Sequence, residues 1–436
     1  MKVLKFGGTS VATPEARRAS ANLVRTQKEP VVAVVSAHDG VTELLDEAAR
    51  AAAAGNRRRL ARHVAEVRAR HDGPLLDELE RVLAGLAALG ELTPRSRDLV
   101  LSFGERLSAP MFAADLGSSA VALDGGAAGI VTDEQWGEAS PLREVTRHEL
   151  RQRVAPLLEQ GRIPVVTGFI GVTQHGALTT LGRGGSDFTA TLVGAALGAG
   201  EVWLCSDADG LRAADPRIVA EAAPLPEISF AEAMEMVQFG AKGIHPRALE
   251  PAVESGIPVR ILNTFRPDVP GTRIGPVAAS GPGAVRSVHL VRDVSLLTVA
   301  GAAMVGRRGT AARIFETVAS AGGNVRMISQ SVSESGISIA VSRRDLEAVR
   351  AALEGALVRP GLVRQIQIED EVGIVAVVGE AMRGTPGIAA RLFGAVARAG
   401  VNVVAIAQGS SELSISFIVE TARGEDAVRA VYSEFL

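Results

Sequence analysis

The sequence predicts an α/β protein in which a mainly parallel sheet is followed by two copies of a smaller α/β repeat. Two observations lead to this prediction. Apolar runs typical of buried strands alternate with amphipathic helical patterns through about residue 265, which favours βαβ units. A different pattern follows, because residues 301–341 align without gaps to residues 379–419 and share 22 of 41 positions.

Composition limits the class of protein. A length of 436 residues suggests two or three domains, and an apolar content of 47% is far from that of a disordered chain. An aromatic content of 3% and a net charge of −3 argue against nucleic-acid binding. The single cysteine, Cys205, cannot form an internal disulfide, and no apolar run reaches the ~18 residues of a membrane span. With no signal-like start, we expect a cytoplasmic protein.

The first part of the chain can be assigned element by element. Met1 leads directly into the strand-like "KVLKF", and further apolar runs predict buried strands at 31–36, 162–171, 201–210 and 257–263. Between Val41 and Leu116 the pattern is mostly helical, with an arginine-rich face that we interpret as a solvated surface. Residues 265–285 are dense in Pro and Gly and predict a linker.

The repeat predicts a small domain in each copy. Each copy runs as strand, Gly-rich loop, helix, strand, turn and strand, an order that suits a ferredoxin-like βαββαβ unit. The strand-like "RSVHLV" at 286–291 precedes the first copy but is a candidate for the sheet of the second. We therefore expect a catalytic domain at 1–280 and two small domains at 281–360 and 361–436.

The tetrapeptide "KFGG" places Lys5 on a strand immediately before Gly7 and Gly8. Glycines at a strand end let the backbone approach a bound group, and their N–H groups can form an anion nest. An adjacent ammonium would neutralise a phosphate. The alternative is a plain tight turn before a helix capped by Thr13 with Pro14 at its first position.

A second Gly-rich turn, from Gly182 to Ser186, precedes an Ala-rich helix. Helix N-termini attract anions, and Arg183 is placed to hold a carboxylate bidentately. Asp187, in the first helical turn, either interacts favourably with the helix dipole or orients the groups of the site. Glu105 stands in an apolar helical stretch, where a buried carboxylate needs a cationic partner such as a substrate ammonium.

Small hydroxyl residues follow the second strand. Ser36 and Thr42 lie where ligands bind at the carboxyl end of a parallel sheet, although simple turn chemistry would also explain them.

These stretches together resemble the aspartate kinases, members of the amino-acid kinase fold family. The resemblance covers nearly the whole chain and rests on motifs in the family's order: "KFGGTSV", "SFGERLSA", "TGFIG", "LGRGGSDFTA", "SDADGLRAADPRIV", "FGAKGIHPRALEPA" and "IPVRILNTF". It implies a three-layer amino-acid-kinase sandwich. The C-terminal repeat resembles the paired ACT domains of this family.

The resemblance implies roles for individual residues. Lys5, Asp187 and Lys242 would be catalytic, and a larger set would bind ATP: Lys5, Gly7, Gly8, Ser206, Asp207, Arg212, Arg217, Lys242 and Gly243. The family often has Tyr where Arg212 stands, which leaves the adenine contacts open. Arg183 would bind the substrate α-carboxylate and Glu105 the α-ammonium, beside Ser36, Thr42, Gly185 and Ser186.

The implied reaction is phosphorylation of the L-aspartate β-carboxylate by ATP, the first step towards lysine, threonine and methionine. The nucleophile, with a reference pKa of about 3.9, is already ionised at neutral pH, so no general base is required. No side chain stands out as a metal ligand, and Mg²⁺ is expected to arrive on ATP. The alternatives are a non-catalytic amino-acid sensor and a kinase for another small acid such as glutamate.

The repeat also implies assembly and regulation. In related kinases ACT domains pair between chains, so we expect a homodimer or a higher oligomer. The repeats resemble those of the bifunctional aspartate kinase–homoserine dehydrogenases, which implies threonine as effector ahead of lysine, with no effector as a further alternative. The matching residues are Asn324, Gln330, Asn402 and Gln408. The simpler interpretation is that these side chains cap strand ends in a duplicated repeat.

Overall fold

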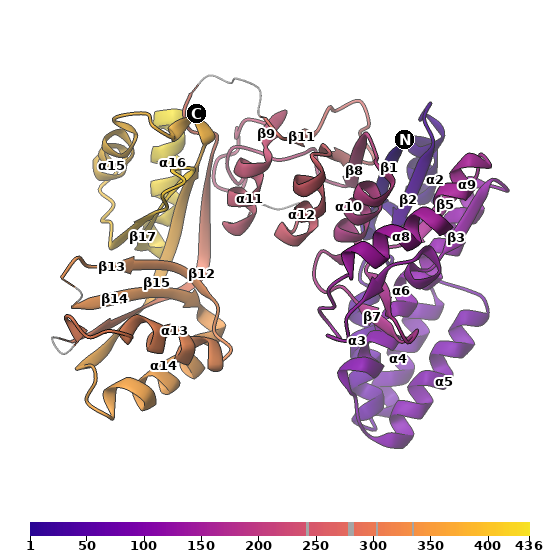
Figure 1. Cartoon of the computed structure of the whole chain (residues 1–436), viewed down its shortest axis with the longest axis horizontal. Helices are drawn as coiled ribbons and strands as arrows, with labels where there is room; N and C mark the ends of the chain where they lie inside the picture. The colour runs from indigo at the N-terminus through magenta and orange to yellow at the C-terminus, as the bar shows by residue number, and fades with distance from the viewer. Residues whose placement is uncertain (241–243, 278–282, 302–303, 334) are drawn as a thin grey trace. The chain divides into compact units, whose positions relative to one another are not determined.

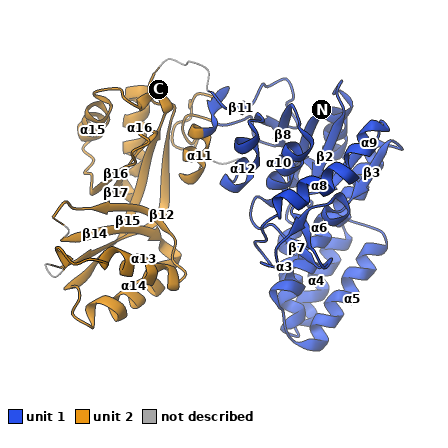
Figure 2. Cartoon of the chain, viewed as in Figure 1, with its two compact units in different colours: residues 1–211, 225–230, 242–279 blue, residues 212–224, 231–241, 280–436 orange. Residues whose placement is uncertain are grey.

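The computed structural model describes residues 1–240, 244–277, 283–301, 304–333 and 335–436. These residues form two compact units, coloured separately in Figure 2. The first unit contains residues 1–211, 225–230 and 242–279, and the second contains residues 212–224, 231–241 and 280–436. The α/β fold class predicted from the sequence is confirmed, while the predicted domain boundaries at 280 and 360 stay predictions.

The first unit is built around an eight-stranded sheet (Figure 1). Its described neighbouring strands are parallel, apart from the antiparallel pair of β10 and β11. In spatial order the strands are β3 (Ala120–Leu123), β5 (Ile163–Thr167), β2 (Val31–Val35), β1 (Lys2–Phe6), β8 (Glu201–Ser206), β10 (Val259–Asn263), β11 (Thr272–Gly275) and β9 (Glu227–Ser229). All five residues of β2 are buried, as expected for a strand covered on both faces.

Helices cover both faces of this sheet and make the unit three-layered. A core containing Leu4, Phe6 and Phe112 joins the sheet to α2 and α6 on one face, and α10 packs on β1 and β8 from the other. The helices of the unit are α1 (Gly8–Val11), α2 (Pro14–Arg25), α3 (Val41–Ala53), α4 (Arg57–Arg68), α5 (Pro74–Leu89), α6 (Pro94–Leu116), α7 (Gly125–Ala128), α8 (Arg143–Arg153), α9 (Ala155–Glu159), α10 (Gly185–Leu197) and α12 (Pro246–Ser255).

Several local predictions for this unit are confirmed and others are corrected. The strand predicted at 201–210 ends at Ser206, and the linker predicted at 265–285 contains β11 of the large sheet. The Thr13 hydroxyl accepts a hydrogen bond from the Ala16 N–H (3.2 Å), and Pro14 occupies the first turn of α2. The stretch from Val41 to Leu116 contains the four helices α3 to α6, which share one buried apolar cluster. The predicted strand at 162–171 is instead two strands, because the chain turns at Phe169 between β5 and β6. A small second sheet contains β4 (Val131–Thr132), β6 (Ile170–Thr173) and β7 (Leu178–Thr180).

The second unit contains a six-stranded sheet in the order β13-β14-β12-β15-β17-β16. Its main elements are α11 (Phe230–Gln238, whose first residue belongs to the first unit), β12 (Ser287–Ala300), α13 (Thr310–Ser320), β13 (Val325–Gln330), β14 (Gly336–Ser342), α14 (Leu346–Leu353), β15 (Gln365–Val378), α15 (Ile388–Arg398), β16 (Ala405–Gln408), β17 (Ser414–Glu420) and α16 (Gly424–Phe435). Shorter helical turns are Arg343–Asp345, Glu354–Val358, Glu380–Met382 and Thr421–Arg423.

The two repeats share their long strands. Residues 287–291 of β12 pair with residues 374–378 of β15, and residues 294–300 of β12 lie between β14 and the first half of β15. The prediction that "RSVHLV" contributes to the sheet of the second repeat is therefore confirmed. Each half of the sheet has its own core, with Val396, Phe417 and Val428 in one and Ile314, Ile339 and Val349 in the other.

Candidate active site

The candidate site begins at one edge of the large sheet, where β1, β2 and β8 end together. These strands are parallel, so their carboxyl ends lie at the same edge. The Gly7 N–H donates to the Cys205 carbonyl oxygen (3.0 Å), and the Ser36 N–H donates to the Phe6 carbonyl oxygen (3.1 Å). The three loops that follow the strands are thereby held side by side.

Gly8 lies at the point of closest approach between two of these loops. A Cβ atom on Gly8 would lie 3.1 Å from the Ala37 carbonyl oxygen and 3.1 Å from the Asp39 Cα. Both neighbours are backbone atoms, so a side chain here would require the loop after β2 to move by a few tenths of an ångström. Glycine therefore favours close packing of Gly8 against the loop after β2.

Lys5 forms an ion pair with Asp187, from the first turn of α10. The Lys5 Nζ lies 2.6 Å from the Asp187 Oδ1, and the two side chains are only 13% and 14% exposed. The sequence left open whether Asp187 serves the helix dipole or orients the site. The ion pair favours the second interpretation, because it places the Asp187 carboxylate directly against the Lys5 ammonium.

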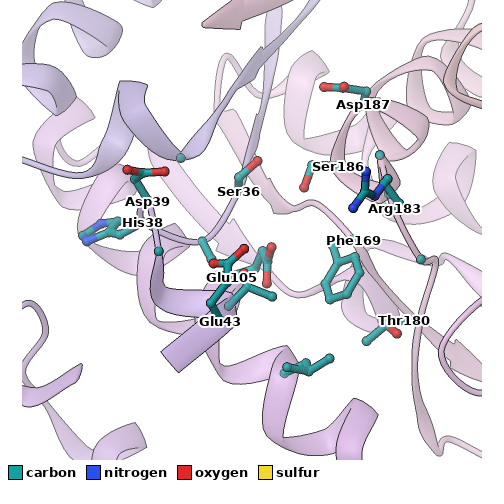
Figure 3. Close-up of a pocket in the computed structure, with 18 of the residues that line it drawn as sticks. Ser36, His38, Asp39, Glu43, Glu105, Phe169, Thr180, Arg183, Ser186 and Asp187 are labelled. Atoms are coloured by element: carbon teal, nitrogen blue, oxygen red, sulfur yellow. The ribbon is translucent and has the colours of Figure 1, made fainter. Parts of the chain in front are cut away.

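A cavity of about 540 Å³ opens beside this ion pair (Figure 3). Ser36, His38 and Asp39 lie on one side of it, and Arg183 and Ser186 on the other. The residues that line the cavity are Lys5, Gly8, Ser36, Ala37, His38, Asp39, Gly40, Thr42, Glu43, Arg97, Leu101, Glu105, Gly137, Phe169, Thr180, Gly182, Arg183, Gly184, Gly185, Ser186 and Asp187. Charges of both signs face one space, which suits a small zwitterionic or dicarboxylic ligand.

Glu105 is the most deeply buried charged group of the cavity. Its side chain comes from α6, the residue is 3% exposed, and its Oε2 has no hydrogen-bond partner among the described residues. Burial raises the pKa of Glu105 to about 8, although the Ala37 N–H and the Lys5 charge oppose this rise. A carboxyl group in this environment is stabilised in its ionised form only when a cation binds beside it.

Arg183 provides the opposite charge. It is exposed, follows Gly182 and Thr180 along the cavity wall, and makes no ion pair with the residues that the structure describes. An unpaired guanidinium that lines a cavity can bind a ligand carboxylate through two parallel hydrogen bonds.

Similar proteins identify the family. Residues 1–263 match the amino acid kinase family, and residues 297–357 and 375–435 match an ACT domain. The chloroplastic aspartokinase 1 of Arabidopsis thaliana is 33% identical to the chain, over 99% of the chain and 80% of that protein.

The chain belongs to the aspartokinase family.

Three further comparisons agree with the aspartokinase assignment. The bifunctional aspartokinase/homoserine dehydrogenase 1 of the same plant is 34% identical, and the chain spans about half of it (51%). The structure of E. coli aspartokinase III with aspartate and ADP (R-state) matches with a TM-score of 0.82 and 29% identity, over 100% of this chain and 99% of that one. The same enzyme with lysine and aspartate (T-state) matches with a TM-score of 0.80 and the same identity and coverage.

All six predicted aspartokinase substrate residues come together in the cavity. Ser36, Thr42, Glu105, Arg183, Gly185 and Ser186 all line it, with Lys5, Gly8 and Asp187. Gly7 is not among the lining residues, although it precedes Gly8 directly.

The predicted nucleotide residues are more widely distributed. Ser206 ends β8 and its Oγ accepts a hydrogen bond from the Ala208 N–H (3.2 Å), while Asp207 is exposed. Arg212 and Arg217 belong to the second unit, where Arg212 donates to the Ala222 carbonyl oxygen (2.8 Å) and Arg217 pairs with Asp215. Lys242 and Gly243 lie outside the described residues.

The four predicted effector residues of the ACT repeats are exposed. Asn324 and Asn402 precede β13 and β16, and Gln330 and Gln408 end these strands. The two strands lie together, since the Ser329 Oγ donates to the Ile406 carbonyl oxygen (3.0 Å).

Sequence reasoning missed several residues of the site. Phe169 lines the cavity with a φ of 65°, which is unusual for a residue with a side chain, and its motif "TGFIG" was the available signal. Buried Asp98 holds two residues of the cavity wall, and no local pattern distinguished it.

His38 is a further residue without an assigned role. Its ring stacks on that of His71 with centroids 4.3 Å apart, and both rings are buried. Burial, with the nearby charges of His71, Arg17 and Arg70, lowers the pKa of His38 to about 3. The imidazole pair is therefore neutral at physiological pH.

The described residues contain neither a cluster of metal ligands nor a membrane-spanning helix. In the described part of the chain, no group of three or more His, Cys, Asp or Glu side chains could hold a metal ion. None of the described helices has the length and apolar character needed to cross a bilayer. The expected cytoplasmic location stays a prediction, and the plant relatives are named as chloroplastic.

Proposed function

We propose that this aspartokinase transfers the γ-phosphoryl group of ATP to the β-carboxylate of L-aspartate, giving β-aspartyl phosphate and ADP. The observation that carries the proposal is the juxtaposition of the Lys5–Asp187 ion pair with the buried, unpartnered carboxyl of Glu105 in one cavity. Relatives that are named aspartokinases, one of them with aspartate and ADP bound, support this choice of substrates.

The amino acid is held by complementary charges. Its α-ammonium binds Glu105, which ionises as the cation arrives, and its α-carboxylate binds Arg183. Ser36, Thr42 and Ser186 contribute hydroxyl groups, while Gly185 lets the start of α10 pack closely against Phe169 in the cavity wall. This arrangement directs the β-carboxylate towards Lys5.

Phosphoryl transfer then needs positioning and charge neutralisation. A β-carboxylate oxygen forms the new O–P bond, the bond from the γ-phosphorus to the β–γ bridging oxygen breaks, and its electron pair leaves with ADP. Lys5, paired with Asp187, and the N–H group of Gly8 offset the negative charge of the phosphoryl group. Gly7 shapes the turn before Gly8, because its own N–H is engaged by the Cys205 carbonyl oxygen. Lys242 is the second phosphate-side lysine, and Ser206, Asp207, Arg212, Arg217 and Gly243 contact the nucleotide.

Mg²⁺ would enter with ATP, bound by phosphate oxygens and water. The described residues do not offer a protein cage for it, since Asp187 is already paired with Lys5.

The second unit would bind an amino-acid effector and pair with a second chain. A glutamine amide such as that of Gln330 or Gln408 offers both donors and an acceptor to an amino acid. Threonine is the proposed effector because the repeats resemble those of the bifunctional enzymes. Lysine is the alternative because E. coli aspartokinase III binds it. The product would serve the synthesis of lysine, threonine and methionine, with the chain acting as a homodimer in the cytoplasm.

One assay tests the proposal against its alternatives. ADP release is measured with aspartate, glutamate and N-acetylglutamate as acceptors, each with and without threonine or lysine. We expect ADP release with aspartate only. A preference for glutamate would make the chain a kinase of another acid, and the absence of turnover with every acceptor would favour the sensor.

A further inference from the structure

Asp98 is a fully buried carboxylate on α6 that accepts three hydrogen bonds. Its Oδ2 accepts from the Gly137 N–H (2.9 Å) and the Thr180 N–H (2.8 Å), and its Oδ1 accepts from the Thr180 hydroxyl (2.8 Å). Burial raises the pKa of Asp98, and the three hydrogen bonds and Arg97 oppose the rise. A buried carboxylate is a costly way to stabilise a core, so this geometry indicates a positional role.

Both partners of Asp98 belong to the cavity wall. Gly137 and Thr180 line the cavity, and the Ala139 N–H donates to the Thr180 carbonyl oxygen (2.9 Å). Arg247 joins the same two segments, since it donates to the carbonyl oxygens of Leu181 (3.2 Å) and Ala139 (3.3 Å). Residues 180–181, which precede Arg183, are therefore hydrogen-bonded to residues 137–139 directly and through Arg247. Asp98 connects both segments to α6.

The same helix carries Glu105. Leu101 and Glu105 follow Asp98 by three and seven residues, a spacing that places all three on one helix face. Leu101 and Glu105 line the cavity, and Asp98 contacts its wall. One rigid helix thus connects the carboxyl assigned to the ammonium with the segment before the guanidinium assigned to the α-carboxylate.

We infer that Asp98 is a positioning residue that sets the distance between the α-carboxylate site at Arg183 and the ammonium site at Glu105. The inference rests on the proposed function, because it assumes an α-amino acid in the cavity. It assigns Asp98 to acceptor binding and leaves the nucleotide site independent of it.

The test is the Asp98→Asn variant of the full chain. An amide retains the shape but loses the charge: with its oxygen on the two N–H donors, its NH₂ faces the Thr180 hydroxyl, which must reverse and accept. The three hydrogen bonds then lose their charge-assisted strength, so the wall segment is held less firmly. We expect the aspartate KM to rise about tenfold or more, with the ATP KM and kcat each within about twofold. Binding of aspartate 1-amide, which lacks the α-carboxylate, should be unchanged in a competition assay.

Asp115→Asn is the matched control on the same helix. Asp115 pairs with Arg17 (2.7 Å) and does not line the cavity, so this variant should lower the unfolding midpoint and leave the aspartate KM unchanged. Two results for Asp98→Asn would overturn the inference. One is an equal rise of the aspartate KM and the ATP KM, and the other is an equal loss of affinity for aspartate and for aspartate 1-amide.

A second variant covers the case in which Asp98→Asn does not fold. Thr180→Val removes only the hydroxyl bond to Asp98, and we expect a smaller rise confined to the aspartate KM. An unchanged aspartate KM in Thr180→Val would then contradict the inference. Failure of the proposed function is distinguished by the wild-type protein, which would release no ADP with aspartate.

Discussion

Glu105→Gln should make the ligand-free protein more stable and a poorer binder of aspartate. The pKa of the buried Glu105 carboxyl is raised from 4.5 to about 8, so the folded state binds a proton that the unfolded state has lost. This group therefore destabilises the fold as pH rises from 4.5 to about 8, with a cost of roughly 3 kcal/mol at pH 7. Glutamine resembles the protonated acid and removes that cost.

The gain in stability is measurable because both tryptophans, Trp136 and Trp203, belong to the first unit. Urea unfolding followed by tryptophan fluorescence should show equal stability of wild type and Glu105→Gln near pH 4.5. At pH 7 the variant should be more stable by up to ~3 kcal/mol. A variant that is less stable by the same amount at both pH values would refute the reasoning.

Aspartate binding provides the second half of this prediction. Pairing with the ammonium ionises Glu105, so wild type should release about nine-tenths of a proton per aspartate at pH 7, as a pKa of about 8 implies. Calorimetry in two buffers of different ionisation enthalpy measures this release. Loss of the buried counter-charge should weaken aspartate binding in Glu105→Gln by ~10²-fold or more. Binding without proton release would contradict the assigned role.

Three further perturbations follow from the same geometry. Lys5→Ala removes the ammonium held by Asp187, and steady-state kinetics should show kcat lowered by ~10²-fold or more; a near-normal kcat would exclude the role of Lys5. Arg183→Lys replaces a bidentate fork by a point charge, so the aspartate KM should rise much more than the ATP KM, and equal rises would place Arg183 elsewhere. His38 has a pKa lowered to about 3, so it destabilises the fold as pH falls below 6.5, and His38→Phe should lessen the loss of stability by ~2 kcal/mol at pH 5. The exposed His148, changed to Gln, is the control, and parallel pH profiles of wild type and His38→Phe would contradict this prediction.

The features that the sequence predicted correctly are encoded locally. The buried strand β2 and the Thr13 cap with Pro14 are each encoded in a few neighbouring residues. The repeat was found because two segments of the sequence match directly, and this match also led to the shared strand. Gly8 was expected to let the backbone approach a bound group, which stays a prediction, and its close approach to the loop after β2 was not foreseen.

The features that were missed arise from residues far apart in the chain. Lys5 and Asp187 were both selected, but only the fold brings them to 2.6 Å. Asp98 meets Thr180 across 82 positions, and the stack of His38 on His71 depends on how α4 ends beneath the loop after β2. A single sequence carries no periodic or motif signal for such contacts.

The most direct test of the central claim is to trap the product. Wild-type protein is incubated with ATP, Mg²⁺, L-aspartate and hydroxylamine, which converts an acyl phosphate into a hydroxamate, and the hydroxamate is identified by mass spectrometry alongside ADP. The proposed reaction predicts aspartate β-hydroxamate and ADP in equal amounts, with neither formed when aspartate is replaced by glutamate. ADP without hydroxamate, or a hydroxamate formed at the α-carboxyl group, would contradict phosphorylation of the β-carboxylate.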